Sequence, residues 1–336
     1  MQDIFSFFGL KDNPFKLEVI LETFVGYKAE RERLKRAIES REKIILISGP
    51  TGAGKTTLML WMYNNLNYKY REYFYRPFDN RDEFSTLLIN KHSSFFERFF
   101  NKIKKEDIMK FLNKKEFVIF IDEATFMKED MIEWIKVLAD QTKATFVLAG
   151  LPEFEERLLR NHRTFYERIL TKIYLKSLDL ESSKELIRKR LELAGNPNLF
   201  TEDALEVLYK ITGGFPRELL KLAYEALLVA YKENKKIIDE EIIEKIYEEK
   251  RPPQLVLKLT EKQKYIAESI VKYGPKSVNE LLNIVKERYP DMSIHALSNI
   301  LKRMVRAGYL VRTKVKGKFV YDVVPAIKNY LIKEHM

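Results

Sequence analysis

The first half of the chain alternates short apolar runs with amphipathic stretches, and this alternation predicts an α/β domain. Short continuous apolar runs are typical of parallel strands that are buried on both faces. An amphipathic helix is expected around Ala29–Ile38. The order of elements favours a parallel sheet with helices on both faces, within residues 1–176. Strands are expected just before Gly49 and at Tyr73–Arg76, Phe117–Ile121, Ala144–Ala149 and Lys172–Leu175.

The apolar pattern changes after residue 176. From 177 to 250 apolar residues recur at helical spacing without a convincing strand, so we expect an all-helical domain. Residues 251–258 are expected to be a linker, because Pro252 and Pro253 cannot continue a helix. Residues 259–336 show three helical patterns and then two alternating runs, the order of a winged helix-turn-helix. These elements are expected near Thr260–Lys272, Ser277–Tyr289, Ser293–Ala307, Tyr309–Val315 and Phe319–Val323.

The residues after the first predicted strand have the spacing G-x-x-x-x-G-K-[ST], which is typical of a phosphate-binding loop. Glycines allow backbone N–H groups to close around a phosphate, and the following helix offers it a positive end. Lys55 is expected to contact the β- and γ-phosphates, and the Thr56 hydroxyl to ligate Mg²⁺. A glycine-rich turn that binds nothing is the alternative. The residues expected to bind nucleotide here are Gly49, Pro50, Thr51, Gly52, Ala53, Gly54, Lys55, Thr56 and Thr57.

A second apolar run, Phe117–Ile121, ends in two acids, Asp122 and Glu123. Ligands of parallel sheets bind at the carboxyl ends of the strands, where both acids are expected. We therefore add Asp122 to the nucleotide and magnesium ligands. Glu123 is expected to polarise the water that attacks the γ-phosphate. Two acids in a solvated turn are the alternative, which the preceding phosphate loop disfavours.

Composition narrows the class of protein. The 336 residues include no cysteine and four scattered histidines, which excludes disulfides and thiolate metal sites and argues against a histidine metal centre. The apolar runs are too short to cross a bilayer and no signal peptide is evident, so we expect a cytoplasmic protein without a membrane partner. High Lys, Glu and Ile usage resembles that of hyperthermophile proteins.

The positive charge is concentrated at the C-terminal end. Residues 255–336 contain sixteen Lys and Arg against seven Asp and Glu, which gives +9 of the chain's net +11. A basic module on a nearly neutral body indicates a polyanionic partner, here duplex DNA. The alternative is a basic module that docks on protein. The residues expected to contact DNA are His295, Asn299, Lys302, Arg303 and Arg306 on the third helix, and Lys314, Lys316 and Lys318 on the hairpin.

Several ordered segments resemble AAA+ ATPases of the ExeA, TniB and MuB group, relatives of the archaeal origin-recognition/Cdc6 initiators that also carry a C-terminal winged helix. The resemblance covers about residues 5–245. It implies the AAA+ P-loop NTPase fold, a lid for the helical domain, and ATP with Mg²⁺ as ligands. The segments are Phe8–Phe15, the phosphate loop, Phe120–Ala124, Leu148–Glu153, Tyr166–Ile169 and Gly213–Arg217.

The same resemblance assigns roles to two arginines. Arg168 matches the finger that reaches the γ-phosphate of a neighbouring subunit, with Arg163 and Arg160 as alternatives. A surface salt bridge is the other interpretation of Arg168. Arg217 matches the second sensor, a lid arginine that touches the nucleotide, although an arginine at a helix start is also explained structurally.

Two further matches concern the adenine and the attacking water. Asn13–Phe15 and Phe24–Tyr27 fall where the family contacts adenine, although aromatic residues there are equally typical of core. Initiators usually place an asparagine at the end of the strand after the two acids, where this chain has Ala149-Gly150. This departure predicts slow ATP hydrolysis that is stimulated by assembly or DNA.

The leading hypothesis is an ATP-dependent DNA-binding ATPase that forms a ring or helical filament on duplex DNA. Its process would be replication initiation, helicase loading or target regulation by a mobile element, with a replication or transposition protein as a further partner. The alternative is a signalling switch of the STAND type whose winged helix docks on a protein.

Overall fold

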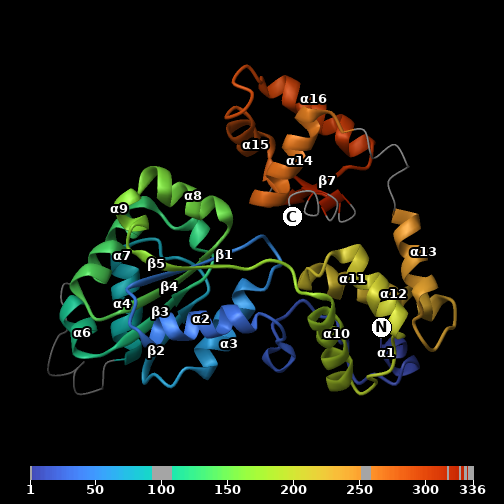
Figure 1. Cartoon of the computed structure of the whole chain (residues 1–336), viewed down its shortest axis with the longest axis horizontal. Helices are drawn as coiled ribbons and strands as arrows, with labels where there is room; N and C mark the ends of the chain where they lie inside the picture. Colours follow the sequence, from blue (N-terminus) through green and yellow to red (C-terminus); the bar gives the residue numbers. More distant parts are fainter. Residues whose placement is uncertain are drawn as a thin grey trace. The chain divides into compact units, whose positions relative to one another are not determined.

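The structure is a computed structural model that describes residues 2–92, 108–250, 259–315, 318–324, 327–328 and 331 (Figure 1). Lys316 lies outside these residues. Contacts divide the chain into two compact units. One unit comprises Val19–Gly49 and Gly54–Leu175, and the other comprises Met1–Glu18, Pro50–Ala53 and Lys176–Met336.

A five-stranded parallel sheet forms the centre of the first unit, with the strand order β2-β3-β4-β1-β5. Every residue of β1, β3 and β4 is buried, which explains why these segments are continuous apolar runs. Exposed and buried residues alternate in the edge strand β5. The strands are β1 (Ile44–Ser48), β2 (Tyr70–Phe74), β3 (Phe117–Ile121), β4 (Thr145–Gly150) and β5 (Ile169–Tyr174).

Helices cover both faces of this sheet (Figure 1). On one face, a single apolar core joins the sheet to α4 (Arg81–His92), α6 (Ile108–Lys114), α7 (Glu129–Gln141), α8 (Pro152–Asn161) and α9 (Arg163–Tyr166). The other face carries α2 (Lys28–Glu39) and α3 (Lys55–Asn65), and Tyr63 of α3 packs on Phe120 of β3. Short 3₁₀ turns lie at η1 (Leu21–Thr23) and η3 (Ala124–Phe126). The predicted α/β sheet is confirmed.

Two strands begin earlier than predicted. β2 starts at Tyr70 rather than Tyr73, because its charged residues find partners that no local pattern reveals. Glu72 is buried and bound by Lys91 and His92, while Arg71 donates to backbone carbonyls. β5 starts at Ile169 rather than Lys172. Its exposed residue Leu170 is apolar, so the sequence does not alternate between apolar and polar residues there, although buried and exposed positions do alternate in the structure.

The second unit contains a group of helices: α1 (Gln2–Phe7), α10 (Leu180–Ala194), α11 (Glu202–Thr212), α12 (Pro216–Lys232) and α13 (Glu240–Lys250). Asp179 and Thr201 cap α10 and α11 through their side chains. The N-terminal segment is attached to these helices. Lys11 N donates to the Ala194 carbonyl at 2.8 Å, and the Arg190 guanidinium donates to the carbonyls of Lys16 and Glu18.

The C-terminal module of this unit comprises α14 (Glu261–Tyr273), α15 (Val278–Val285), α16 (Ile294–Arg306) and an antiparallel sheet in the order β6-β8-β7. The hairpin joins β7 (Leu310–Val315) to β8 (Lys318–Val323), and the short β6 (Lys276–Ser277), which the sequence did not predict, pairs with β8. Capping boxes at Thr260 and Ser277 start α14 and α15. α15 ends at Val285, four residues before the expected Tyr289.

Candidate nucleotide-binding site

The phosphate loop connects buried β1 to α3, and its backbone requires glycine. Gly52 has φ +84° and Gly54, the N-cap of α3, has φ +92°, in the left-handed region that side chains disfavour. A Cβ on Gly49 would lie 2.7 Å from the Leu175 carbonyl oxygen. The loop therefore keeps the shape that brings backbone N–H groups and a helix N-terminus to one point.

Lys55 is the first residue of α3 and folds back over this loop. Its side chain is buried, and Nζ donates to the Gly49 carbonyl oxygen at 2.8 Å. The ammonium group therefore lies within the curve of the loop, as predicted for a lysine that binds phosphates.

The carboxylate of Asp122 joins the two predicted motifs. Its Oδ2 accepts a hydrogen bond from the Thr56 hydroxyl at 2.6 Å and another from the Tyr73 hydroxyl at 3.0 Å, while Oδ1 accepts from Glu123 N at 2.8 Å. Burial, followed by the nearby Asp122 charge, raises the pKa of Tyr73, so its hydroxyl keeps the proton that it donates. The hydroxyl and carboxylate expected to hold Mg²⁺ are thus in direct contact.

Glu123 differs from Asp122 in its exposure. Glu123 is exposed and has φ +51°. This left-handed conformation costs on the order of 1–3 kcal/mol in residues other than glycine. Strain of this kind is common where a side chain must be aimed at a ligand. The turn places the two neighbouring acids in different surroundings, one buried against α3 and one facing solvent.

The segment Gly213–Arg217 is folded by its two glycines. Gly214 has φ +77°, and a Cβ there would lie 2.1 Å from the Leu178 carbonyl oxygen. Pro216 starts α12 and Arg217 follows it. A Cβ on Gly52 would lie 3.0 Å from the Cβ of Arg217. The Cβ of Arg217 therefore lies close to Gly52, and the second-sensor role of Arg217 stays a prediction.

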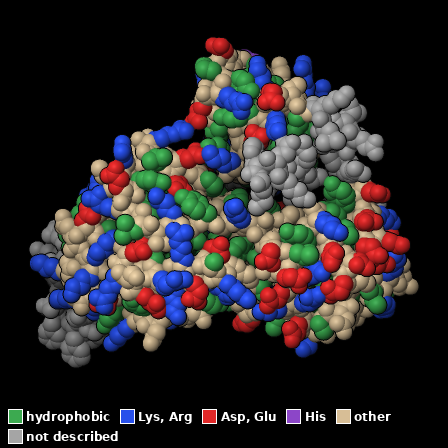
Figure 2. Space-filling view, in the orientation of Figure 1, with side chains coloured by type: hydrophobic (Ala, Val, Ile, Leu, Met, Phe, Trp, Pro, Cys, Tyr) green, Lys and Arg blue, Asp and Glu red, His purple; other side chains and the backbone are tan. Residues whose placement is uncertain are grey.

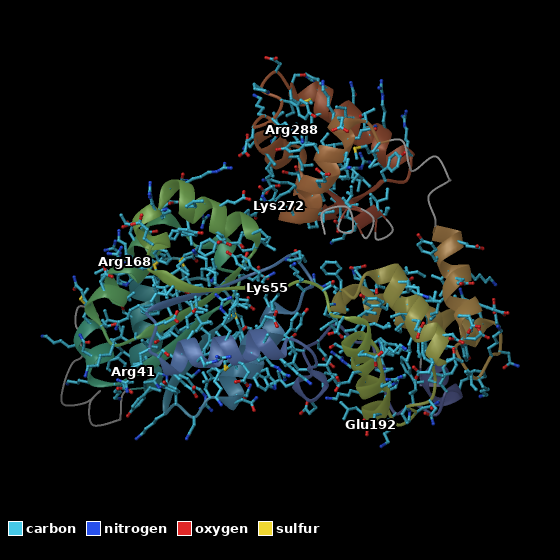
Figure 3. All side chains as sticks on the ribbon, viewed as in Figure 1. Arg41, Lys55, Arg168, Glu192, Lys272 and Arg288 are labelled. Carbon is cyan, nitrogen blue, oxygen red and sulfur yellow. The ribbon has the colours of Figure 1, made fainter. Side chains whose placement is uncertain are left out.

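Arg168 lies well away from Lys55 (Figure 3). Its guanidinium binds Asp140 of α7 in a bidentate pair, with Nε 2.6 Å from Oδ1 and Nη2 2.7 Å from Oδ2. These hydrogen bonds lower the pKa of Asp140. Arg163, an alternative finger, is more exposed and pairs with Glu167.

The end of β4 lies between β3 and β1, and its last residues have no polar side chain. A Cβ on Gly150 would crowd Phe154 and the Thr125 hydroxyl at 3.1–3.2 Å. Thr125 accepts a hydrogen bond from Leu151 N at 2.7 Å. The position where initiators have asparagine is thus a tightly packed turn in this chain.

Aromatic side chains flank the loop on the α2 and α3 side. The rings of Phe24 and Tyr27 stack at 6.3 Å, Trp61 lies 5.8 Å from Phe24, and Arg31 lies over both Phe24 and Trp61. Tyr27 is 3.8 Å from the position of a Cβ on Gly54. Phe15, in contrast, is buried and packs on Phe200 as an ordinary core residue.

The predicted DNA contacts on α16 form one exposed face. His295, Asn299, Lys302, Arg303 and Arg306 are all exposed, whereas Leu297, Leu301 and Met304 are buried in the module core. Lys314 and Lys318 are exposed on the hairpin. In the view of Figure 2, Lys and Arg side chains are spread over this module, and Asp and Glu gather over the region of α11–α13.

The comparisons with known proteins agree with this geometry. Residues 38–158 match the family described as AAA domain. The ORC2 protein of Aeropyrum pernix, solved with ADPNP and ADP, is similar with a TM-score of 0.59 at 15% identity, covering 96% of each chain. The chain has the AAA+ fold. The ORC1 protein of the same organism, solved in complex with DNA, shares it with a TM-score of 0.51 at 17% identity, covering 93% of each chain.

A curated relative matches part of the chain. General secretion pathway protein A of Aeromonas hydrophila is 24% identical over 245 residues, which cover 67% of this chain. The chain spans 44% of the length of that relative. None of the helices in the described part of the chain is long and apolar enough to cross a membrane.

The donor set of the site fits a nucleotide with Mg²⁺. Lys55, Thr56 and Asp122 lie at a loop whose Gly52 and Gly54 have the positive φ that lets backbone N–H groups face a phosphate. Tyr73 is the site residue that sequence reasoning missed. A tyrosine on an edge strand gives no local signal of its role, because its contact with Asp122 joins residues far apart in the chain.

Proposed function

We propose that this chain is an ATP-dependent DNA-binding ATPase that assembles on duplex DNA. The observation that carries the nucleotide part is the 2.6 Å contact between Thr56 and Asp122, which joins the phosphate loop to the two-acid strand. ATP with Mg²⁺ supplies a transferable phosphoryl group and a cation that neutralises its charge.

The chain's own residues then have separate tasks. The loop N–H groups and Lys55 bind and orient the phosphates, and Thr56 with Asp122 holds the cation. Glu123, exposed at the end of β3, takes up the proton of the attacking water. Arg217 couples the helical part to the loop. Arg168 acts on a neighbouring subunit, and its position away from Lys55 supports this role.

The DNA part is supported by charge and exposure. The +9 charge of residues 255–336 and the exposed stripe of α16 provide phosphate and base-edge donors on one surface. The ORC1 protein of Aeropyrum pernix, which has a similar fold, was solved in complex with DNA, and this supports the proposal. Replication initiation, helicase loading and mobile-element targeting are the processes that we propose for it.

Duplex binding measured by fluorescence anisotropy across a salt series tests this function. Affinity should fall steeply between about 50 and 200 mM salt, with a slope of about −0.9 per phosphate contact. Replacing Lys302 and Arg306 by alanine should lower the slope by about two contacts. The matched control replaces Arg188 and Lys189 on α10, which removes the same charge elsewhere. Salt-independent binding, or no binding, would contradict the DNA role and favour a protein partner for the module.

A further inference from the structure

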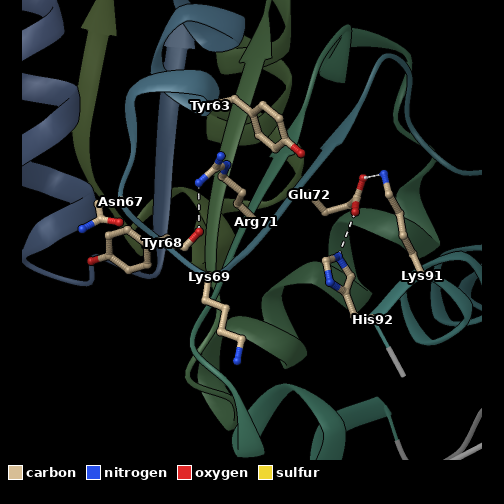
Figure 4. Close-up of a pocket in the computed structure, with 8 residues that line it drawn as sticks. All are labelled: Tyr63, Asn67, Tyr68, Lys69, Arg71, Glu72, Lys91 and His92. Atoms are coloured by element: carbon tan, nitrogen blue, oxygen red, sulfur yellow. Dashed lines mark hydrogen bonds and ion pairs between the residues drawn. The ribbon is translucent and has the colours of Figure 1, made fainter. Parts of the chain in front are cut away.

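A polar pocket lies at the edge of the sheet, at the amino end of β2 (Figure 4). Its volume is about 550 Å³, in the range of sites for small ligands. The lining residues come from α3, the following segment with the start of β2, and the last turn of α4. The phosphate loop and Asp122 lie at the carboxyl ends of their strands. The pocket is therefore at the opposite end of the sheet from the candidate nucleotide site.

Positive charge exceeds negative charge in this pocket. The described lining contains Lys69, Arg71 and Lys91 against the single acid Glu72. Glu72 is 2% exposed, and its two oxygens bind Lys91 Nζ at 2.5 Å and His92 Nε2 at 2.9 Å. Burial alone would raise the pKa of Glu72, but these hydrogen bonds outweigh it and lower the pKa. The carboxylate is thus neutralised within the pocket, and the charges of Lys69 and Arg71 remain in excess.

Arg71 is held in place by neutral partners. Its Nη1 donates to the carbonyl oxygens of Leu66 at 2.7 Å and Tyr68 at 3.0 Å, and its guanidinium lies 5.3 Å from the centre of the Tyr63 ring. Within the described part of the chain, no carboxylate lies within 4.0 Å of Arg71 or Lys69. A held guanidinium with remaining N–H donors is well suited to phosphate oxygens.

The pocket also offers aromatic surfaces. Figure 4 shows Tyr63 and Arg71 on one side and Glu72 with Lys91 and His92 on the other, with Tyr68 beside Asn67. Tyrosine rings stack on planar bases, and an asparagine amide supplies a further donor and acceptor. This combination distinguishes the site from one for inorganic anions alone.

We propose that this pocket binds a nucleoside phosphate, with Arg71 on the phosphate group, the exposed Lys69 side chain turning toward it, and a tyrosine ring against the base. The ligand is either a free nucleotide or one unit of a single-stranded nucleic acid, since both present the same chemistry. The site is separate from the phosphate loop and goes beyond the function proposed above.

Calorimetric titration with AMP tests the proposal in the full chain carrying Lys55→Met, which disables the phosphate loop. One AMP should bind per chain. Lys69→Met and Arg71→Met should each weaken this binding about tenfold, as expected for loss of a charge-assisted contact. The matched control is Lys143→Met, which removes a charge from an exposed turn of the same unit and should leave the affinity unchanged.

Absence of AMP binding in the Lys55→Met chain would overturn the site, and so would equal affinities in Lys69→Met and Lys143→Met. Lys69 is exposed and contacts only the Tyr70 ring among the interactions described for it, so Lys69→Met should fold even where Arg71→Met does not. Displacement of AMP by a short oligothymidine would identify the single strand as the ligand, and failure to displace it would identify the free nucleotide. Neither result depends on ATP hydrolysis or duplex binding, so failure of the pocket proposal would leave the proposed function unaffected, and failure of the proposed function would leave the pocket proposal unaffected.

Discussion

Asp122 is the residue at which the candidate site is most tightly determined. Three donors from three different segments, Thr56, Tyr73 and the Glu123 backbone, converge on one buried carboxylate. Groups that hold a metal ligand in place affect metal affinity nearly as strongly as the ligands themselves. We therefore expect Tyr73 to be a positioning residue for the proposed magnesium ion, acting through Asp122.

Tyr73→Phe should lower the Mg²⁺ affinity of the nucleotide-bound protein about tenfold, because it removes one hydrogen bond to the charged Asp122 carboxylate. Titration of Mg²⁺ with a fluorescent nucleotide measures this effect. Nucleotide affinity in the presence of a chelator should stay unchanged. The control is Tyr75→Phe, whose ring packs on Tyr73 but is 68% exposed. An identical Mg²⁺ dependence in the two variants would exclude the positioning role.

Gly214→Ala should destabilise the fold more than Gly195→Ala. Both glycines have positive φ, +77° and +102°, so both substitutions strain the backbone by on the order of 1 kcal/mol. Only the Cβ of an alanine at Gly214 would also lie 2.1 Å from a backbone oxygen, whereas the atoms nearest a Cβ at Gly195 are 3.5 Å away or more. Thermal unfolding of the two variants measures the difference. Equal losses would show that the turn before Arg217 relaxes freely.

At the level of elements, the sequence predicted what burial and motif spacing determine together. β3 and the phosphate loop were predicted with correct positions, because a strand buried on both faces leaves a continuous apolar run and the glycines leave a fixed spacing. β2 could not be placed correctly, since its charged residue Glu72 is buried through contacts with Lys91 and His92 of α4, which are far away in the sequence. β6 consists of two residues and exists through its pairing with β8.

The ion pair between Asp140 and Arg168 joins α7 to the segment after α9. The Arg168 side chain is 35% exposed and the Asp140 side chain 42% exposed. An exposed pair of this kind stabilises the fold by at most about 1 kcal/mol. The proposed action of Arg168 on a neighbouring subunit would require it to leave Asp140. Asp140→Asn should therefore raise ATP turnover in the assembled state by up to about fivefold, with little change in unfolding temperature.

A coupled hydrolysis assay at high protein concentration measures this effect, and Arg168→Ala provides the comparison. Arg168→Ala should lose turnover while it retains nucleotide affinity, as expected for a residue that acts in trans. If Arg168→Ala hydrolyses ATP at the unchanged rate, Arg163 or Arg160 takes over as the candidate finger.

For the whole molecule, we predict that ATP and duplex DNA together increase the particle size. Light scattering in moderate salt should detect a ring or filament, because interfaces that include a bound nucleotide form only in the loaded state. Lys55→Ala should remain small under the same conditions. A wild-type particle of unchanged size in every state would point to a monomeric switch with a protein partner.

The packing of Gly52 against Arg217 also says something about relatives of this chain. Gly52 occupies one of the variable positions of the loop motif. The atom nearest to a Cβ placed on it is the Cβ of Arg217, and every residue except glycine would carry that atom at position 217. Rotamer changes of Arg217 do not move its Cβ, so a side chain in place of Gly52 would require a backbone shift of a few tenths of an ångström. We therefore expect a relative with a larger residue at this place to pack these two segments less closely, so that this one residue reports their spacing from sequence alone.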